Sequence, residues 1–268
     1  EGDAVSGDIW SQEKNILKTL PKSAERRFQH NKDTDWAGYI NLAYDTHLAD
    51  KLDALWKVGA QYRRKERSNR YYSYVFNPTD ISQQLDGNGY EQFANVDWVC
   101  KTPYSQASQL NYDSKEHIGG VYAMATLSSA LGELNVGLRA EHTNQIYTML
   151  QHFRNMGQVG EQSYWDYLPS ASVKWTPTKK MNVRLSYYRS INRPGFYEIV
   201  PYQIQGEEYQ EKGNPELKRA RIDNIDLRWE WFPSSTEQIL AGVFYKYLKN
   251  PIEQVFVTSD GKIGAGTD

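Results

Sequence analysis

Apolar and polar side chains alternate along several stretches of this sequence. In residues 35–45, Trp36 and every second residue up to Tyr44 form one mostly apolar set. The alternation resumes after the short polar segment 49–53, where one set consists of Trp56, Val58, Ala60 and Tyr62. Successive side chains of a β-strand point to opposite faces of a sheet. These two stretches therefore predict a β-hairpin with one apolar face.

Three more hairpins follow the same pattern. Their strands are residues 118–126 with 136–140 around 131–133, residues 167–175 with 181–189 across 176–180, and residues 222–232 with 238–248 across 233–237. In the first of these we expect one apolar face to hold Ile118, Gly120, Tyr122, Met124, Thr126, Val136, Leu138 and Ala140. Val183, Leu185 and Tyr187 define the apolar face of the next hairpin. Ile225, Leu227, Trp229 and Trp231 define that of the last.

Short and long connections alternate along the chain. The four short turns interleave with long segments that lack a sustained period and that we interpret as loops: residues 1–34, 64–116, 144–164, 190–221 and those beyond 249. Short periplasmic turns on one rim and long extracellular loops on the other are typical of outer-membrane barrels. The pattern predicts an all-β protein, an antiparallel up-and-down transmembrane β-barrel. We expect a partial barrel of about eight strands in four hairpins with long extracellular loops.

Strand length and aromatic content support a membrane setting. The expected strands reach the ~9–11 residues needed to cross a bilayer at a tilt, whereas soluble strands average about 5–6. Aromatic residues make up 13% of the chain, and such side chains favour membrane interfaces. Trp56, Trp175 and Trp231 lie near the short turns, where we expect an aromatic girdle. A mean hydropathy of -0.75 and the lack of a run of eighteen apolar residues exclude a helical membrane protein.

Composition excludes several other functions. The net charge of -2 gives no basic surplus for a nucleic-acid partner. The single cysteine, Cys100, excludes internal disulfides and sites built from several cysteines. Common catalytic motifs are absent, and the five histidines show no ligand spacing. We therefore expect no enzyme, no catalytic residues, no metal and no cofactor.

Three motifs in residues 168–253 resemble the C-terminal barrel of TonB-dependent receptors. They are LPSASVKWTPTKKMNVRLSYYRSINRPGF at residues 168–196, GNPELKRARIDNIDLRWEWFP at 213–233 and FYKYLKNPIE at 244–253. GLRAEHT at 137–143 and QYRRKERSNRYY at 61–72 fit the same family less distinctively. Two of these motifs also contain residues that end strands or form turns. Pro194 and Gly195 end a strand, and residues 213–217 form a turn before the next one.

The resemblance implies a location, a function and partners. It implies the bacterial outer membrane and a barrel of about twenty-two strands filled by an N-terminal plug. We expect residues 1–268 to be a single domain, a fragment of such a barrel in which the N-terminal plug domain is absent. The function implied is that of a receptor or transporter for a large scarce nutrient, such as a siderophore, glycan, peptide or cobalamin. The partners implied are the TonB energy-coupling complex, acting through the plug, outer-membrane lipid and a surface lipoprotein.

Charged residues on the polar faces, or near the rim, are the candidates for contact with a ligand or plug. They are Arg139, Glu141, Arg184, Arg189, Arg193, Asp226, Arg228 and Glu230. Each of them could instead form an ordinary ion pair within the barrel wall. The run of residues 63–70 could contact lipopolysaccharide phosphates, or be a solvated extension of a strand.

Two other protein classes remain open from the sequence. A soluble carbohydrate-binding β-sheet protein would have shorter strands and no alternation of turn lengths. A porin or adhesin barrel without a plug would share the strand pattern.

Overall fold

A curved antiparallel β-sheet dominates the computed structural model, which describes residues 24–79, 97–105, 110–150, 158–205 and 210–256. Its strands are β1 (Ala24–Ala49), β2 (Leu52–Pro78), β3 (Trp98–Ser105), β4 (Tyr112–Ser129), β5 (Gly132–Met149), β6 (Val159–Thr178), β7 (Met181–Asn192), β10 (Ala220–Trp231) and β11 (Ile239–Lys249). The connection from β7 to β10 holds the short helix α2 (Phe196–Ile199) and the two-stranded sheet β8 (Gln203–Gln205) and β9 (Gln210–Lys212). Within the described ranges, no helix combines the length and hydropathy needed to cross a membrane.

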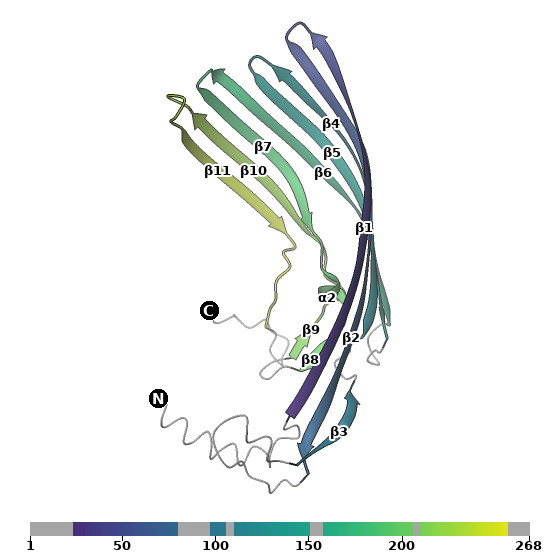
Figure 1. The fold of residues 1–268 in the computed structure, drawn as a ribbon. Helices are drawn as coiled ribbons and strands as arrows, with labels where there is room; N and C mark the ends of the chain where they lie inside the picture. The colour runs from purple at the N-terminus through teal and green to yellow at the C-terminus, as the bar shows by residue number, and fades with distance from the viewer. Residues whose placement is uncertain (1–23, 80–96, 106–109, 151–157, 206–209, 257–268) are drawn as a thin grey trace, which may run out of the picture.

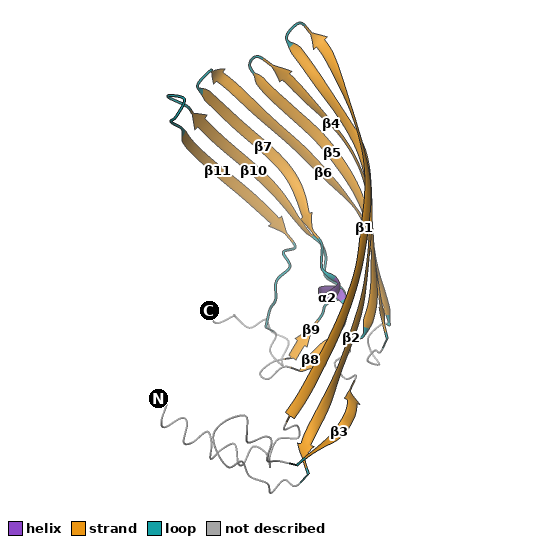
Figure 2. Cartoon of the chain, viewed as in Figure 1, coloured by secondary structure: helices purple, strands orange, loops and turns teal. Residues whose placement is uncertain are grey.

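The strands follow one another in the up-and-down order that the sequence predicts. The sheet order is β1-β2-β4-β5-β6-β7-β10-β11, and all neighbours are antiparallel. The four predicted hairpins are confirmed as β1–β2, β4–β5, β6–β7 and β10–β11. Their turns lie together on one rim of the sheet (Figures 1 and 2). Eight strands thus form one curved wall, to which β3 adds a short pairing with the far end of β2.

Several strands continue into segments that we expected to be loops. β2 runs to Pro78 and β4 starts at Tyr112, so the loop prediction for residues 64–116 is wrong at both ends and again at β3. Three other loop predictions are also wrong in part. β1 starts at Ala24 within residues 1–34, and β5 and β6 extend into residues 144–164, to Met149 and from Val159. Residues 190–221 contain α2, β8 and β9. These extensions mix charged, polar and aromatic side chains on both faces, which removes the apolar period while leaving the backbone ladder intact. Residues 80–96, 106–109 and 151–157 lie outside the described part.

The register gathers the apolar sets onto one face of the sheet. Residues directly opposite each other in an antiparallel pair point to the same face. One such row crosses all eight strands through Tyr44, Trp56, Ala125, Val136, Ala171, Tyr187, Ile225 and Tyr245. The next row towards the turns contains Thr46, Ala54, Leu127, Leu134, Val173, Leu185, Leu227 and Val243. These rows lie on the convex face, opposite the concave side that holds α2 (Figure 1).

The register corrects our face assignment for β4. Leu138 pairs with Ala123 and Val136 pairs with Ala125, so these residues share the convex face. Tyr122 pairs with Arg139 instead. The prediction that Ile118, Gly120, Tyr122, Met124 and Thr126 share a face with Leu138 is therefore wrong. Since neighbouring positions of β4 are small or apolar on both faces, the period did not reveal which set faces out.

The convex face forms an apolar belt bounded by aromatic side chains. Near the turns lie the exposed rings of Trp56, Trp175 and Trp231, in agreement with the predicted girdle. At the opposite limit Trp36 lies beside Tyr62, with 5.5 Å between ring centroids, and Trp165 is exposed on β6. Exposed aliphatic side chains fill the space between these limits. An exposed apolar face of this size excludes the soluble carbohydrate-binding alternative, because water would be in contact with it.

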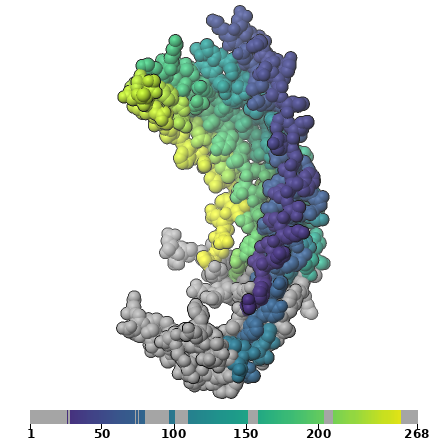
Figure 3. All heavy atoms as spheres, viewed as in Figure 1, coloured from purple at the N-terminus to yellow at the C-terminus, as the bar shows by residue number. Residues whose placement is uncertain are grey.

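The two outer strands do not pair with each other. Among the described residues, β1 and β11 lie at opposite ends of the sheet order, and each has one edge without a partner strand. β1 extends along one side of the molecule from rim to rim (Figure 3). The predicted partial barrel of about eight strands is confirmed, because the described strands do not close on themselves. The sheet is a section of an open wall.

Candidate functional site

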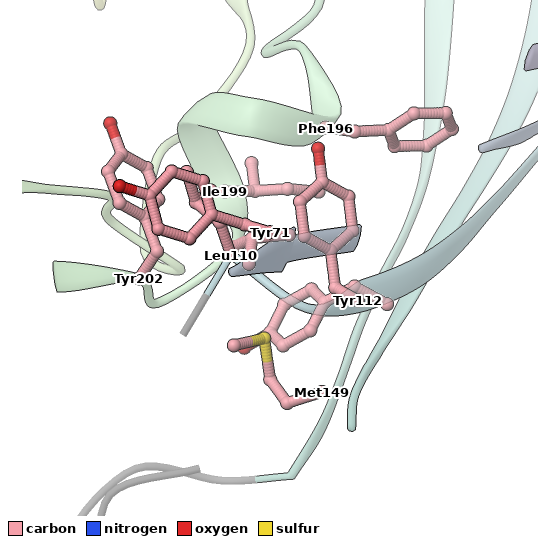
Figure 4. Packing of buried hydrophobic residues seen from close by; sticks show 9 residues of the cluster. Tyr71, Leu110, Tyr112, Met149, Phe196, Ile199 and Tyr202 are labelled. Atoms are coloured by element: carbon pink, nitrogen blue, oxygen red, sulfur yellow. The ribbon is translucent and has the colours of Figure 1, made fainter. Parts of the chain in front are cut away.

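The connection between β7 and β10 folds over the concave face of the sheet. We call residues 193–205 and 210–219 the inner segment. Its buried side chains Phe196, Ile199, Val200 and Tyr202 pack against Tyr71, Leu110, Tyr112, Tyr147 and Met149 (Figure 4). Burial of such apolar side chains contributes roughly 1.5–3 kcal/mol each. The inner segment is therefore part of the folded wall at the end far from the short turns.

Local sequence explains how the inner segment leaves β7. The strand ends at Asn192, and the following Arg193-Pro194 cannot continue the ladder because proline lacks an N–H. Gly195 caps α2, and its N–H donates to the Glu198 carboxylate at 2.8 Å. The predicted strand end at Pro194 and Gly195 is thus confirmed.

The Gly213-Asn214-Pro215 turn attaches the second half of the inner segment to α2. The Asn214 N–H donates to the Glu198 carbonyl at 2.7 Å. The Glu216 N–H donates to the Asn214 side chain at 2.9 Å. A Cβ on Gly213 would lie 1.9 Å from the Val200 carbonyl oxygen, so only glycine fits there. The turn predicted for residues 213–217 is confirmed, and its role is to fix the segment.

A buried ion network connects the inner segment to β5. Glu141 is only 8% exposed and accepts a hydrogen bond from Arg139 at 2.5 Å and another from Arg193. Arg193 also donates to the Thr143 hydroxyl at 2.9 Å, and Arg139 donates to the Gln61 side chain at 3.1 Å. The structure thus brings together three of the predicted candidate residues. A carboxylate between two arginines is satisfied despite its burial.

A second network was not found from the sequence. Asp166 on β6 is 1% exposed and accepts hydrogen bonds from Arg219 at 2.7 Å and from Arg221 at 3.1 Å. Arg219 also lies 4.1 Å from the centroid of the Tyr164 ring. Extending the β6 alternation back from residue 168 would have placed Asp166 on the polar face. Its arginine partners lie more than fifty residues away, so no local pattern could indicate them.

A third network lies nearer the short turns. Glu230 accepts hydrogen bonds from Arg184 and Asn182, each at 3.2 Å, and forms an ion pair with Arg228 at 3.2 Å. Asp226 has the same orientation as Arg228 and Glu230, since it lies two residues from Arg228 on β10. All four predicted candidates in this region are therefore on the concave face, and Arg184 and Arg228 are about half exposed there.

Arg189 is on the opposite face from the other candidates. It pairs in register with Asp223, and its side chain donates to that carboxylate at 2.8 Å. Both residues alternate in phase with Tyr187 and Ile225, which belong to the convex face. We therefore leave Arg189 out of the candidate site.

Three buried polar atoms of the concave face have no hydrogen-bond partner in the described chain: Gln145 Oε1, Ser114 Oγ and Tyr164 Oη. Gln145 is 1% exposed; its amide donates to Glu116 at 2.7 Å and to the Pro194 carbonyl at 3.1 Å. The Gln145 Oε1 and Ser114 Oγ atoms accept no hydrogen bond from any described residue. Buried water commonly satisfies such groups, so polar positions lie beside the apolar cluster beneath the inner segment.

A tyrosine pair attaches the β8–β9 hairpin to α2. The hydroxyls of Tyr197 and Tyr202 donate to the same Glu211 carboxylate at 2.9 and 2.7 Å. Burial raises the pKa of Tyr197 to about 12, and it raises the pKa of Tyr202 above its usual range. Both hydroxyls therefore remain protonated donors at neutral pH.

The site as a whole offers binding chemistry. Its charged groups are fixed arginines and carboxylates on a concave surface, which suits contact with a charged ligand or a protein domain inside a barrel. Within the described ranges no three His, Cys, Asp or Glu side chains lie close enough to hold a metal ion.

Comparisons with solved structures agree with this fold. The chain is similar to the unliganded ferric citrate transporter FecA, with 14% identity and a TM-score of 0.51, over 81% of this chain and 28% of that one. It is also similar to the ferric yersiniabactin uptake receptor FyuA from Yersinia pestis, with 14% identity and a TM-score of 0.50, over 86% of this chain and 31% of that one. The chain thus spans less than a third of either receptor's length.

Sequence comparison gives the family directly. No curated protein sequence matches the chain. A family model described as the outer membrane protein beta-barrel family matches residues 11–263, almost the whole chain. The fold that the three motifs indicated, that of an outer-membrane β-barrel, is confirmed by this match and by the solved structures. The chain belongs to the outer membrane protein β-barrel family and is located in the bacterial outer membrane.

Proposed function

We propose that this chain forms part of a TonB-dependent outer-membrane receptor that takes up a large scarce nutrient. The observation that carries the proposal is the open eight-stranded wall with a polar concave face. An interior bounded by this wall and further strands would be wider than an eight-stranded barrel, whose interior is just filled by side chains. Similarity in fold to the two iron-uptake proteins supports the same reading.

The concave charges are proposed to contact a plug or a passing ligand. Arg184 and Arg228 are about half exposed beside a single buried carboxylate, so they remain able to bind a second anionic group. Arg139, Glu141 and Arg193 are mutually satisfied, so their proposed role is to hold the inner segment in place. Under this proposal TonB transmits the proton-motive force to a plug inside the barrel. No comparison supports a surface lipoprotein, and we do not include one.

The ligand belongs to the class of siderophores, glycans, peptides or cobalamins under this proposal. Members of these classes that are too large for a passive pore need energy for uptake. Binding and transport by fixed charged side chains then suffice for the function, without a catalytic step.

Uptake measurements in cells test the proposal. A strain lacking the gene for the whole protein is supplied with labelled ferric siderophores, oligosaccharides, peptides and cobalamin, one at a time, with and without the restored gene. The proposal predicts restored uptake of one ligand that a protonophore or loss of TonB abolishes. Restored permeation of small solutes that is indifferent to TonB would instead establish a passive porin. Surface adhesion without any uptake would establish the adhesin alternative.

A further inference from the structure

The convex face of β1, β2 and β4 changes character directly beyond the apolar belt. Trp36 and Tyr62 form the border of the belt. Further from the short turns, most outward positions of these three strands carry charged side chains. Register places five cations there, Arg26, Lys32, Arg64, Arg70 and Lys115, together with the carboxylates Glu66 and Asp113. The histidines His30 and His117 share this face. We call these nine residues the outer basic patch.

The outer basic patch has more positive than negative charge. Five cations face two carboxylates, which leaves an excess of three positive charges. Arg64 is paired with Glu66 and Arg70 with Asp113. Lys32 forms no ion pair with any residue that the structure describes, and Lys115 lies opposite Glu66 in register without an ion pair to it. The carboxylates on this face of the three strands therefore do not balance the cations.

The charge excess is confined to one side and one region of the wall. On the concave face at the same height, Arg63 is paired with Asp35, and Lys65 and Arg67 with Asp33. On the convex face of the neighbouring strands, the positions in register with His117 are Asn144 on β5 and Ser163 on β6. Those in register with Lys115 are Ile146 and the carboxylate Glu161, so neither row carries a cation on these two strands. A general requirement for solubility would not concentrate the cations of one face on three adjacent strands.

Aromatic rings follow the cations further along β1 and β2. Phe28 stacks on Tyr72 with 5.5 Å between ring centroids, and Tyr74 meets Phe28 edge-on at 5.8 Å. Arg26 lies 5.1 Å from the centroid of the Phe28 ring. Eight residues separate Phe28 from Trp36, which is roughly 26 Å along a strand. From the belt outward, the surface is thus aliphatic, aromatic, cationic and again aromatic.

We infer that the outer basic patch and the rings beyond it bind a phosphorylated glycolipid of the outer leaflet. Acyl chains would cover the exposed aliphatic belt. Phosphate groups at the membrane surface would meet the arginines and lysines, which favour anionic headgroups. The sugars above the phosphates would lie at the height of Phe28, Tyr72 and Tyr74, whose rings offer apolar faces and polar edges. The chain thus carries a specific lipid site on β1, β2 and β4, separate from the interior used for uptake.

Native mass spectrometry of the whole purified protein tests the phosphate contact. Delipidated protein in detergent is titrated with a bis-phosphorylated glycolipid and with the same lipid after removal of its phosphates. The double variant Lys32→Gln with Lys115→Gln is expected to bind the phosphorylated lipid about tenfold more weakly than wild type. Wild type is expected to lose affinity similarly for the dephosphorylated lipid. The matched control is Lys65→Gln on the concave face of β2, which should bind like wild type.

Three results would overturn the inference. They are wild-type affinity in the double variant, an equal loss in the Lys65→Gln control, and equal affinity of wild type for both lipids. Heat-modifiable gel mobility of each variant verifies that the barrel has folded. Because lipid binding is measured without any nutrient, the result does not depend on the proposed uptake function.

The aromatic contact has its own test. The double variant Phe28→Ala with Tyr72→Ala is titrated with a phosphorylated glycolipid that carries core sugars and with one that lacks them. We expect a several-fold loss for the sugar-bearing lipid and none for the truncated one, since stacking on a ring contributes of the order of 1 kcal/mol. An equal effect on both lipids would exclude the sugars from the site.

Discussion

At the scale of single residues, the two faces of the wall follow different physical rules. On the convex face Leu138 is 51% exposed, which is favourable only where lipid covers it. One position further along β5, the Arg139 guanidinium lies on the concave face and binds Glu141 and Gln61. Exposure alone does not distinguish the two environments. The partners of each side chain do.

A charge introduced at Leu138 and an apolar side chain introduced at Arg139 should have opposite effects on folding of the barrel. Leu138→Arg places a charge against lipid and should cost roughly 2–4 kcal/mol if the site is near the bilayer midplane. Arg139→Leu should be tolerated, because Glu141 keeps its ion pair with Arg193. Heat-modifiable gel mobility of the whole protein reports folding. A barrel that folds with Leu138→Arg but not with Arg139→Leu would show that the faces are inverted.

Loss of Arg193 should release the inner segment from β5. Arg193→Gln removes one of the two cations that neutralise the buried Glu141, and with it the hydrogen bond to Thr143. We expect a local destabilisation of about 1–3 kcal/mol, measured as faster amide exchange in residues 196–202. The control is Arg184→Gln, which changes an exposed arginine on the same face and should leave that exchange unchanged. Equal exchange in both variants would mean that Arg193 does not anchor the segment.

At the scale of elements, the sequence predicted the strands that carry an apolar period. All four hairpins could be predicted because lipid requires one apolar face on each of their strands. The extension of β2 beyond Arg64 could not, since charged residues occupy both faces as far as Arg70 and tyrosines follow on both. The helix α2 was also missed, because four residues are too few to show a helical period.

The candidate site was predictable only in part for a related reason. Arg139 and Glu141 could be assigned to the polar face from the alternation in β5. Their contact with Arg193 could not, because this residue lies in a segment without a period, about fifty residues away. Pro194 and Gly195 marked the end of β7, yet nothing local indicated that the chain then turns inward.

The inner segment depends on glycine at one turn. Gly213→Ala would place a methyl group 1.9 Å from the Val200 carbonyl oxygen, so the backbone must shift. Overpacking of this kind typically costs about 1–3 kcal/mol, which we expect as increased protease cleavage between residues 196 and 219. Gly38→Ala is the matched control, because a Cβ there meets no atom within 4 Å. The same cleavage rate in both variants would contradict the close packing at Gly213.

At the scale of the whole molecule, the chain is a curved wall whose convex face is apolar and whose concave face is polar. Rows of apolar residues cross eight strands on the convex face. The charged networks and the inner segment occupy the concave face. This arrangement accounts at once for the alternation in the sequence, for the exposed belt and for the membership of an outer-membrane family.

Spin-label accessibility along β5 tests whether lipid covers the convex face and water reaches the concave face. In the whole protein, Cys100 is replaced by serine, and single cysteines are placed one at a time from residue 134 to residue 141. Each is spin-labelled after reconstitution in lipid, and its collisions with membrane-soluble oxygen and with a water-soluble nickel complex are measured. We expect the collision rates to alternate strictly. Collisions with oxygen should dominate at positions 134, 136, 138 and 140, and collisions with the nickel complex at positions 135, 137, 139 and 141. Alternation of the opposite phase, or equal access at every position, would contradict it.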